Sequence, residues 1–217
     1  ELDGVALVRF RRTLDEIIEK GAIAQETELS IEQRLTAFRA EHPDFRGLSF
    51  GTIAGYGAHG AIVHYEADEE SNAPLAPRSF LLLDSGAHYV SGTTDITRTI
   101  PLGPLTDEER KAYTLVLKGH IALARARFPE RTQGLVLDFA ARYAMWQEGM
   151  DFGHGTGHGV GSHLCVHEGP QQIRKNTNAA STTPFVAGMT ITDEPGIYVD
   201  GKFGVRLENV LLTRESR

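Results

Sequence analysis

Two aspartates stand where an ordinary structural role explains them poorly. Asp84 ends the apolar run 80–83, so a buried strand would deliver its carboxylate to the edge of the core. Burying a carboxylate without a partner costs several kcal/mol, so Asp84 needs a cation nearby. The alternative is that Asp84 only opens the turn 84–86. Asp95 follows within the threonine-rich segment 92–99. A short turn between two strands would bring both carboxylates together, where they repel unless metal ions lie between them.

The segment 153–161 alternates glycine with other residues around two histidines, His154 and His158. Glycine at every second position removes side chains, so another group must approach this backbone closely. A nucleotide-binding loop is a poor match because no placement of G-x-G-x-x-G fits. A zinc motif of the H-E-x-x-H kind lacks its glutamate, and the glycines disfavour a helix. We therefore interpret one histidine as a ligand and the other as a neighbouring or substrate-binding group, with His167 a third candidate.

Two glutamates lie on the arms of a hairpin predicted at 200–201, where an Asp-Gly pair separates β-rich runs. Glu194 lies on the first arm and Glu208 on the second, where alternation places Arg206 on the same face as Glu208. The alternative is a pair of solvated charges, because such residues are mostly exposed. Four carboxylates and an imidazole suit two divalent ions such as manganese, cobalt or zinc, and carboxylate-rich sets favour harder ions. Such a centre would activate water for hydrolysis.

The elements that would position these side chains follow from periodicity and caps. Helices then strands occur twice along the chain, which predicts an α+β fold in one domain over 1–217. Ser30 with Gln33, and Thr106 with Glu109, are candidate capping boxes. Helices are expected at 1–20, 30–42, 106–128 and 135–147, and strands at 52–56, 61–65, 80–84, 95–100, 188–199 and 204–212.

Composition narrows the class of protein. The net charge is −7 and acidic and basic residues are interspersed, which argues against nucleic-acid or anionic-membrane binding. Cys165 is the sole cysteine, so no internal disulfide forms, and a cytoplasmic location is the default expectation. No apolar run approaches the roughly 20 residues that span a bilayer. The chain opens at Glu1 without an initiating Met, so we expect a piece of a longer protein.

The motifs together resemble those of the pita-bread metallopeptidases, which include methionine aminopeptidase, prolidase and aminopeptidase P. Four further segments are most similar to the cytosolic-type Xaa-Pro aminopeptidases, with prolidases the nearest alternative; they lie at 60–65, 84–89, 92–99 and 166–170. The motifs that carry the resemblance are Asp84 and Asp95 with their spacing, His-Gly-Thr-Gly-His-Gly-Val-Gly at 154–161, Thr-Asp-Glu-Pro-Gly at 192–196 and Arg-Leu-Glu-Asn at 206–209.

The resemblance implies a role for each site residue. Asp84 would bind one ion, His158 and Glu194 the other, and Asp95 and Glu208 would bridge both. Glu194 would also move a proton during catalysis. The remaining matches line the substrate cleft in the family: His64 and His167 as catalytic and substrate-binding groups, and His154 and Arg206 as substrate-binding groups. The implied reaction removes an N-terminal residue that precedes proline, most often with two manganese ions.

The resemblance also implies an organisation beyond this chain. Relatives carry one or two further N-terminal domains, absent here, and we expect a homodimer of the full-length protein. Some pita-bread domains have lost catalysis and bind protein partners, but those are expected to lack ligands that this chain retains. His163 and Cys165 depart from the family pattern beside the ligand loop, which bears on substrate preference.

Overall fold

The computed structural model describes residues 1–216 and confirms the α+β order of helices and antiparallel strands. The elements of the first half are α1 (Leu2–Glu19), η1 (Ile23–Gln25), α2 (Glu28–Ala40), β1 (Phe45–Leu48), β2 (Ile53–Tyr56), η2 (Gly57–Ala61), β3 (Phe80–Ser85), β4 (Ala87–Tyr89), β5 (Gly92–Thr93) and β6 (Ile96–Pro101). Those of the second half are α3 (Asp107–Ala124), α4 (Gly134–Trp146), β7 (Gly157–His158), β8 (Gln172–Ile173), β9 (Thr190–Asp193), β10 (Gly196–Val199), β11 (Phe203–Arg206) and β12 (Asn209–Leu212). Among residues 1–216, no helix is both long and apolar enough to cross a membrane.

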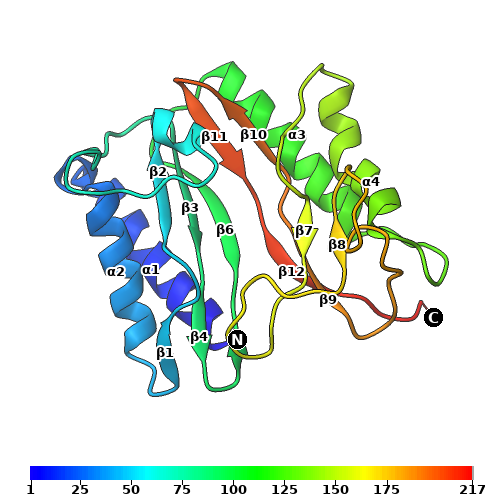
Figure 1. Ribbon diagram of the computed structural model, residues 1–217. Helices are drawn as coiled ribbons and strands as arrows, with labels where there is room; N and C mark the ends of the chain where they lie inside the picture. The colour runs from blue at the N-terminus through cyan, green and yellow to red at the C-terminus, as the bar shows by residue number, and fades with distance from the viewer. Residues whose placement is uncertain (217) are drawn as a thin grey trace.

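Two helix pairs flank the strands that carry the candidate site (Figure 1). The pair α1 and α2 lies beside β2 and β3, and the pair α3 and α4 lies beside the second-half strands. In the first half, β3 pairs with β2 on one side and with β6 on the other. In the second half, β10 pairs with β11 and β9 pairs with β12. The first half therefore supplies a three-stranded antiparallel sheet to the centre of the molecule, and the second half supplies two two-stranded ones.

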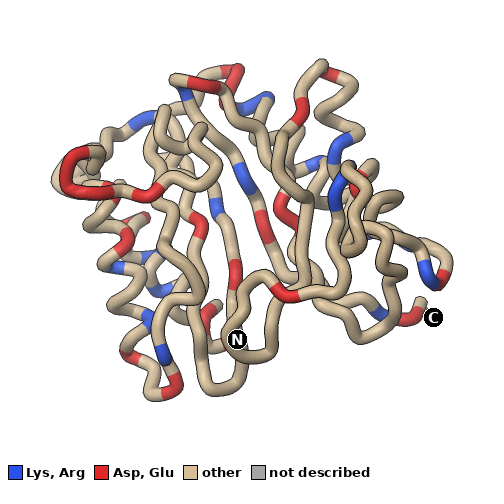
Figure 2. The backbone as a smooth tube through the Cα atoms, viewed as in Figure 1, with Lys and Arg blue, Asp and Glu red and all other residues tan. Residues whose placement is uncertain are grey.

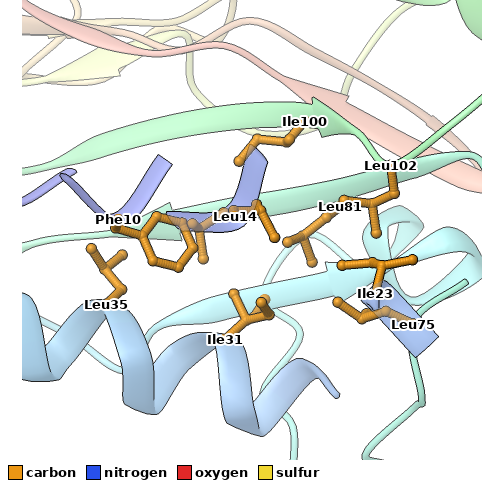
Figure 3. Packing of buried hydrophobic residues seen from close by; sticks show 11 residues of the cluster. Phe10, Leu14, Ile23, Ile31, Leu35, Leu75, Leu81, Ile100 and Leu102 are labelled. Carbon is orange, nitrogen blue, oxygen red and sulfur yellow. The ribbon is translucent and has the colours of Figure 1, made fainter. Parts of the chain in front are cut away.

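Strand β3 is buried on both faces, which explains its continuous apolar sequence. Leu81 and Leu83 pack into a core with Phe10 of α1 and Leu35 of α2 (Figure 3). Phe80 packs into a second core with residues of α3 and β11. Because both faces are covered, the strand is held rigidly up to its last residues, which include Asp84.

A break in the second-half hairpin positions two of the predicted ligands. The runs expected at 188–199 and 204–212 each divide into two strands, and Pro195 marks the first division because proline has no backbone N–H for the ladder. Glu194 lies at the division between β9 and β10, and Glu208 at that between β11 and β12. The hairpin predicted around 200–201 is confirmed by the β10–β11 pairing.

Three local expectations are corrected by the structure. Helix α2 is capped by Thr27, whose side chain pairs reciprocally with Ser30, instead of beginning at a Ser30–Gln33 box. The segment 61–65 is not a strand: η2 ends at Ala61 and a turn follows. Helix α3 ends at Ala124, short of 128, although Phe128 continues the apolar pattern by packing on Phe185. The Thr106–Glu109 capping box is confirmed.

The position of η2 is set by a close approach of two backbones. A Cβ atom on Gly204 of β11 would lie 1.7 Å from the carbonyl oxygen of Gly60. Only glycine allows this contact, so η2 lies against β11 immediately before the segment 61–65. The sequence around Gly60 gives no local sign of a partner so distant along the chain.

We expect Gly204→Ala to destabilise the protein by about 2 to 3 kcal/mol, because the added methyl group must push η2 away from β11. Gly4→Ala is the matched control: Gly4 lies in α1, and a methyl group added there would meet no atom within 4 Å. That control should stabilise the protein by about 0.5 to 1 kcal/mol. Urea unfolding of both variants measures the difference. Equal stabilities would contradict the close contact.

Candidate metal centre and active site

The predicted site residues surround one cavity of about 510 Å³ between the two halves of the molecule. Figure 2 shows acidic positions on the strands at the centre of the fold. The structure brings together all the side chains that the sequence singled out, namely His64, Asp84, Asp95, His154, His158, His167, Glu194, Arg206 and Glu208. Their roles remain predictions, but their convergence from both halves is a property of the fold.

Short hydrogen bonds from threonines fix the two glutamates. Thr97 donates from its hydroxyl to Glu208 Oε2 at 2.7 Å. Thr192 donates to Glu194 Oε1 at 3.0 Å and accepts from the backbone N–H of His158 at 2.9 Å. One hydroxyl therefore sets the position of a carboxylate and of the loop that carries the histidine.

His158 presents one nitrogen to the carboxylates. Its Nδ1 donates to the carbonyl oxygen of Gly159 at 2.9 Å, so Nε2 is the ring nitrogen that is free to bind a metal ion. That Nε2 lies 3.4 Å from Asp95 Oδ2 and 3.3 Å from Glu194 Oε1. One ligand atom each from Asp95, His158 and Glu208 lie within 4.8 Å of one another. This spacing lets a single cation contact all of them.

The carboxylates of the cluster are electrostatically strained without a cation. Burial and the neighbouring carboxylates raise the pKa of Glu208 well above its usual value. Burial, followed by Asp84 and Asp95, raises the pKa of Glu194 to about 7 although His158 opposes the shift. Burial also raises the pKa of Asp84 against the effect of Arg206. The buried Oδ1 of Asp84 has no hydrogen-bond partner among the described residues. The donor set therefore fits divalent cations.

A second network links Asp84 to the substrate side of the cavity. Arg206 donates to Asp84 Oδ2 at 2.7 Å and to the hydroxyl of Tyr198 at 2.8 Å. His154 Nδ1 donates to the Gly155 carbonyl at 2.7 Å, so its Nε2 accepts from the Tyr198 hydroxyl at 2.7 Å. Burial, despite that carbonyl, lowers the pKa of His154 to about 4, with Arg206 and Arg142 adding to the shift. His154 is thus a neutral acceptor at pH 7.

Two further histidines, His64 and His167, line the cavity. The ring centroids of His167 and His158 lie 4.2 Å apart. Burial, followed by the charge of His158, lowers the pKa of His167. His64 lies on the turn after η2 and is exposed to the cavity. His163 and Cys165 line no part of this cavity. Cys165 is exposed, so both departures from the family pattern lie outside it.

Sequence reasoning missed three residues of this site. Thr97 and Thr192 each lie two positions from a predicted ligand, and strand alternation could have placed them on the ligand face. Tyr198 has no motif of its own. It pairs with Gly204 across β10 and β11 and so becomes the diagonal neighbour of Arg206, a relation that needs the strand register.

A curved set of antiparallel strands between helix pairs, with a carboxylate and histidine cluster at its centre, defines the pita-bread class of metallohydrolases. Metallopeptidase family M24 matches residues 1–215, and the chain belongs to this family. A probable Xaa-Pro aminopeptidase P of Laccaria bicolor is 50% identical over 98% of this chain and 33% of that protein.

Solved structures agree with this assignment and confirm the predicted pita-bread fold. An X-prolyl aminopeptidase of Caenorhabditis elegans, described as a cytosolic enzyme with a di-nuclear active site, superposes with a TM-score of 0.91 at 41% identity. The match covers 99% of this chain and 34% of that one. A prolidase of Pyrococcus furiosus gives a TM-score of 0.80 at 27% identity, over 95% and 58% of the two chains. The chain spans about a third of the length of the curated relatives it matches.

The raised pKa values predict how the stability of the protein depends on pH when a chelator keeps metal ions from the site. A carboxyl group whose pKa is higher in the folded state binds more protons when folded, so its contribution to stability is present at low pH and is lost as pH rises. For Glu194 the window runs from about 4.5 to about 7. Across it, we expect the free energy of unfolding to fall by on the order of 2 kcal/mol relative to the Glu194→Gln variant.

Urea unfolding in the presence of a chelator, at several pH values, measures this difference. Asp107→Asn is the control, because Asp107 is fully exposed and its removal should leave the pH dependence unchanged. Adding manganese should abolish the loss of stability, since a bound cation favours the ionised carboxylates. Parallel pH profiles for the wild type and Glu194→Gln would refute the electrostatic assignment.

Proposed function

We propose that residues 1–217 are the catalytic domain of a metal-dependent aminopeptidase that releases the N-terminal residue of peptides with proline at the second position. The observation that carries this proposal is the cluster of Asp95, His158 and Glu208 in a cavity that further histidines also line. The names and descriptions of the relatives support the choice of substrate.

Two divalent ions are the cofactors we assign to the cluster. Asp84, Asp95, His158, Glu194 and Glu208 would hold them, with Asp95 and Glu208 shared between both ions. Manganese is proposed because four of these ligands are carboxylates, and cobalt and zinc are compatible with the set. When bound, the ions polarise the scissile carbonyl group and lower the pKa of the attacking water.

The protein's own residues then have three tasks. Glu194 accepts a proton from the attacking water and passes it to the leaving nitrogen, which needs one because the amide before proline is tertiary and has no hydrogen. His64 and His167 donate hydrogen bonds to the oxygen of the scissile carbonyl as charge develops on it. Tyr198, itself held by Arg206, donates to His154, which burial keeps neutral at the substrate side.

The test is a substrate panel on the full-length, manganese-loaded protein. We expect cleavage of Xaa-Pro-Yaa tripeptides in preference to Xaa-Pro dipeptides and Met-Ala peptides. Asp95→Asn and Glu208→Gln should abolish turnover, because loss of a shared charge misplaces the attacking water. His167→Ala should lower kcat on the order of a hundredfold with metal content unchanged.

His88→Ala is the matched control for the histidine variants, since His88 lies outside the cavity and should leave kcat unchanged. Preference for dipeptides would identify a prolidase instead. An intact protein that binds metal and cleaves none of the peptides would favour a non-catalytic, protein-binding role.

The full-length protein is proposed to form a homodimer and to reside in the cytoplasm, as the description of the Caenorhabditis relative suggests for the location. Helix α4 exposes a stripe of apolar side chains at helical spacing: Val136, Phe139, Tyr143 and Trp146. The rings in this stripe contact one another, with 5.1 Å between the centroids of Phe139 and Tyr143. A two-fold axis would let this face pack on its own copy and remove it from water.

Sedimentation of the full-length protein tests this arrangement. Trp146→Glu and Phe139→Glu should convert the dimer to a monomer, because a charge would then be buried in the interface. Val8→Glu, on the exposed face of α1, is the control and should remain dimeric. A dimer that persists in all three variants would exclude α4 as the interface.

A further inference from the structure

The segment 56–73 forms one wall of the cavity and has little regular structure of its own. It begins at the last residue of β2, forms most of the connection to β3, and contains only the short η2 helix as regular structure beyond β2. Four consecutive residues of this segment, Val63, His64, Tyr65 and Glu66, line the cavity. Because a segment without its own ladder of hydrogen bonds is held by its surroundings, the groups that fix it also fix His64.

One buried carboxylate binds this segment at both ends and in the middle. Glu28, in the first turn of α2, has no exposed surface. It accepts the backbone N–H of Tyr56 at 2.7 Å and that of Ala73 at 2.9 Å. It also accepts the hydroxyl of Tyr65 at 2.8 Å and faces Nδ1 of His59 at 3.0 Å. Glu28 lines no part of the cavity.

These contacts connect Glu28 to the side of the cavity that bears His64. Tyr65 bonds Glu28 through its hydroxyl while its body lines the cavity next to His64. The ring of His59 stacks on Tyr65 with 4.5 Å between centroids. Hydrogen bonds to an ionised carboxylate are stronger than neutral ones, and its loss would leave several buried donors unsatisfied.

We infer that Glu28 is a positioning residue for catalysis: through Tyr65 and the two ends of the segment 56–73, it sets His64 against the substrate carbonyl. The inference rests on the proposed function, because it uses the role given to His64. A catalytic donor displaced by as little as about 1 Å loses much of its effect on rate, so a carboxylate outside the cavity can control turnover.

A double-mutant cycle on the full-length, manganese-loaded enzyme tests the coupling. In the wild-type background, Glu28→Gln should lower kcat about tenfold and change KM less than about threefold, since His64 acts on charge that develops in the transition state. In the His64→Ala background, the same change should lower kcat less than about twofold, because the group that it positions is gone. Equal reductions in both backgrounds would overturn the inference.

Asp3→Asn is the matched structural control. Asp3 is also a buried carboxylate that binds an arginine and a tyrosine, Arg39 and Tyr89, but it has no bond to the segment 56–73. It should lower the melting temperature and leave kcat per folded molecule unchanged. If Glu28→Gln behaves in the same way, its role is structural only. Should Glu28→Gln fail to fold, Tyr65→Phe removes the hydroxyl that binds Glu28 and, at 3.2 Å, the carbonyl oxygen of Ser71, and it should lower kcat about threefold.

Hydrogen exchange separates this inference from the proposed function, because it needs no activity. Glu28→Gln should increase amide exchange in the segment 56–73 by about tenfold or more, while Asp3→Asn should not. Wild-type enzyme that cleaves no Xaa-Pro peptide would sink the proposed function whatever the exchange result. If the wild-type enzyme is active and amide exchange is unchanged in Glu28→Gln, only the inference about Glu28 is refuted.

Discussion

The burial of four carboxylates around one point is the constraint on which the rest of this structure depends. Asp84, Asp95 and Glu208 are all less than a tenth exposed, and burial together with the charges of Asp84 and Asp95 raises the pKa of Glu208 and of Glu194. Such a cluster is tolerated only where geometry is fixed and cations or donors neutralise it. Here Arg206 neutralises one oxygen of Asp84, and the other has no partner among the described residues. The negative charge that Arg206 does not neutralise is what would attract metal ions to the site.

The fold meets this constraint by holding the carboxylates at strand ends and at the breaks between strands. Strand β3 is packed on both faces, so Asp84 cannot move to relieve repulsion. The division of the second-half hairpin at Pro195 places Glu194 and Glu208 at neighbouring breaks in the pairing, where their side chains can turn inward. Thr97 and Thr192 then hold the carboxylates by hydrogen bonds, which limits their rotation. Strand ends and the short breaks between strands therefore carry the carboxylates, and His158 lies on the short strand β7.

Helix α4 connects the outer surface to the glycine-rich loop. Its fully buried Arg142 binds Asp138 and the carbonyl oxygens of Phe152 and His154, just before the proposed ligand His158. The guanidinium also lies 3.7 Å from the centroid of the Phe152 ring. On the opposite side the helix exposes its aromatic stripe. The same helix thus supports the ligand loop from behind, much as Glu28 of α2 supports the wall that bears His64.

The sequence by itself determined the residue types and their approximate elements. Capping at Thr106, the hairpin at 200–201 and the buried strand before Asp84 follow from local propensity and alternation, and the spaced motifs identified the family and predicted the site residues. Tertiary structure decided what depends on contacts between distant segments. The close approach of Gly60 to Gly204 holds η2 against β11 just before the segment 61–65, the register of β10 and β11 placed Tyr198 beside Arg206, and Glu28 reached a segment about thirty residues away. Local preferences act over a few residues, whereas these contacts form only when distant segments pack together. For that reason no local sequence motif predicts them.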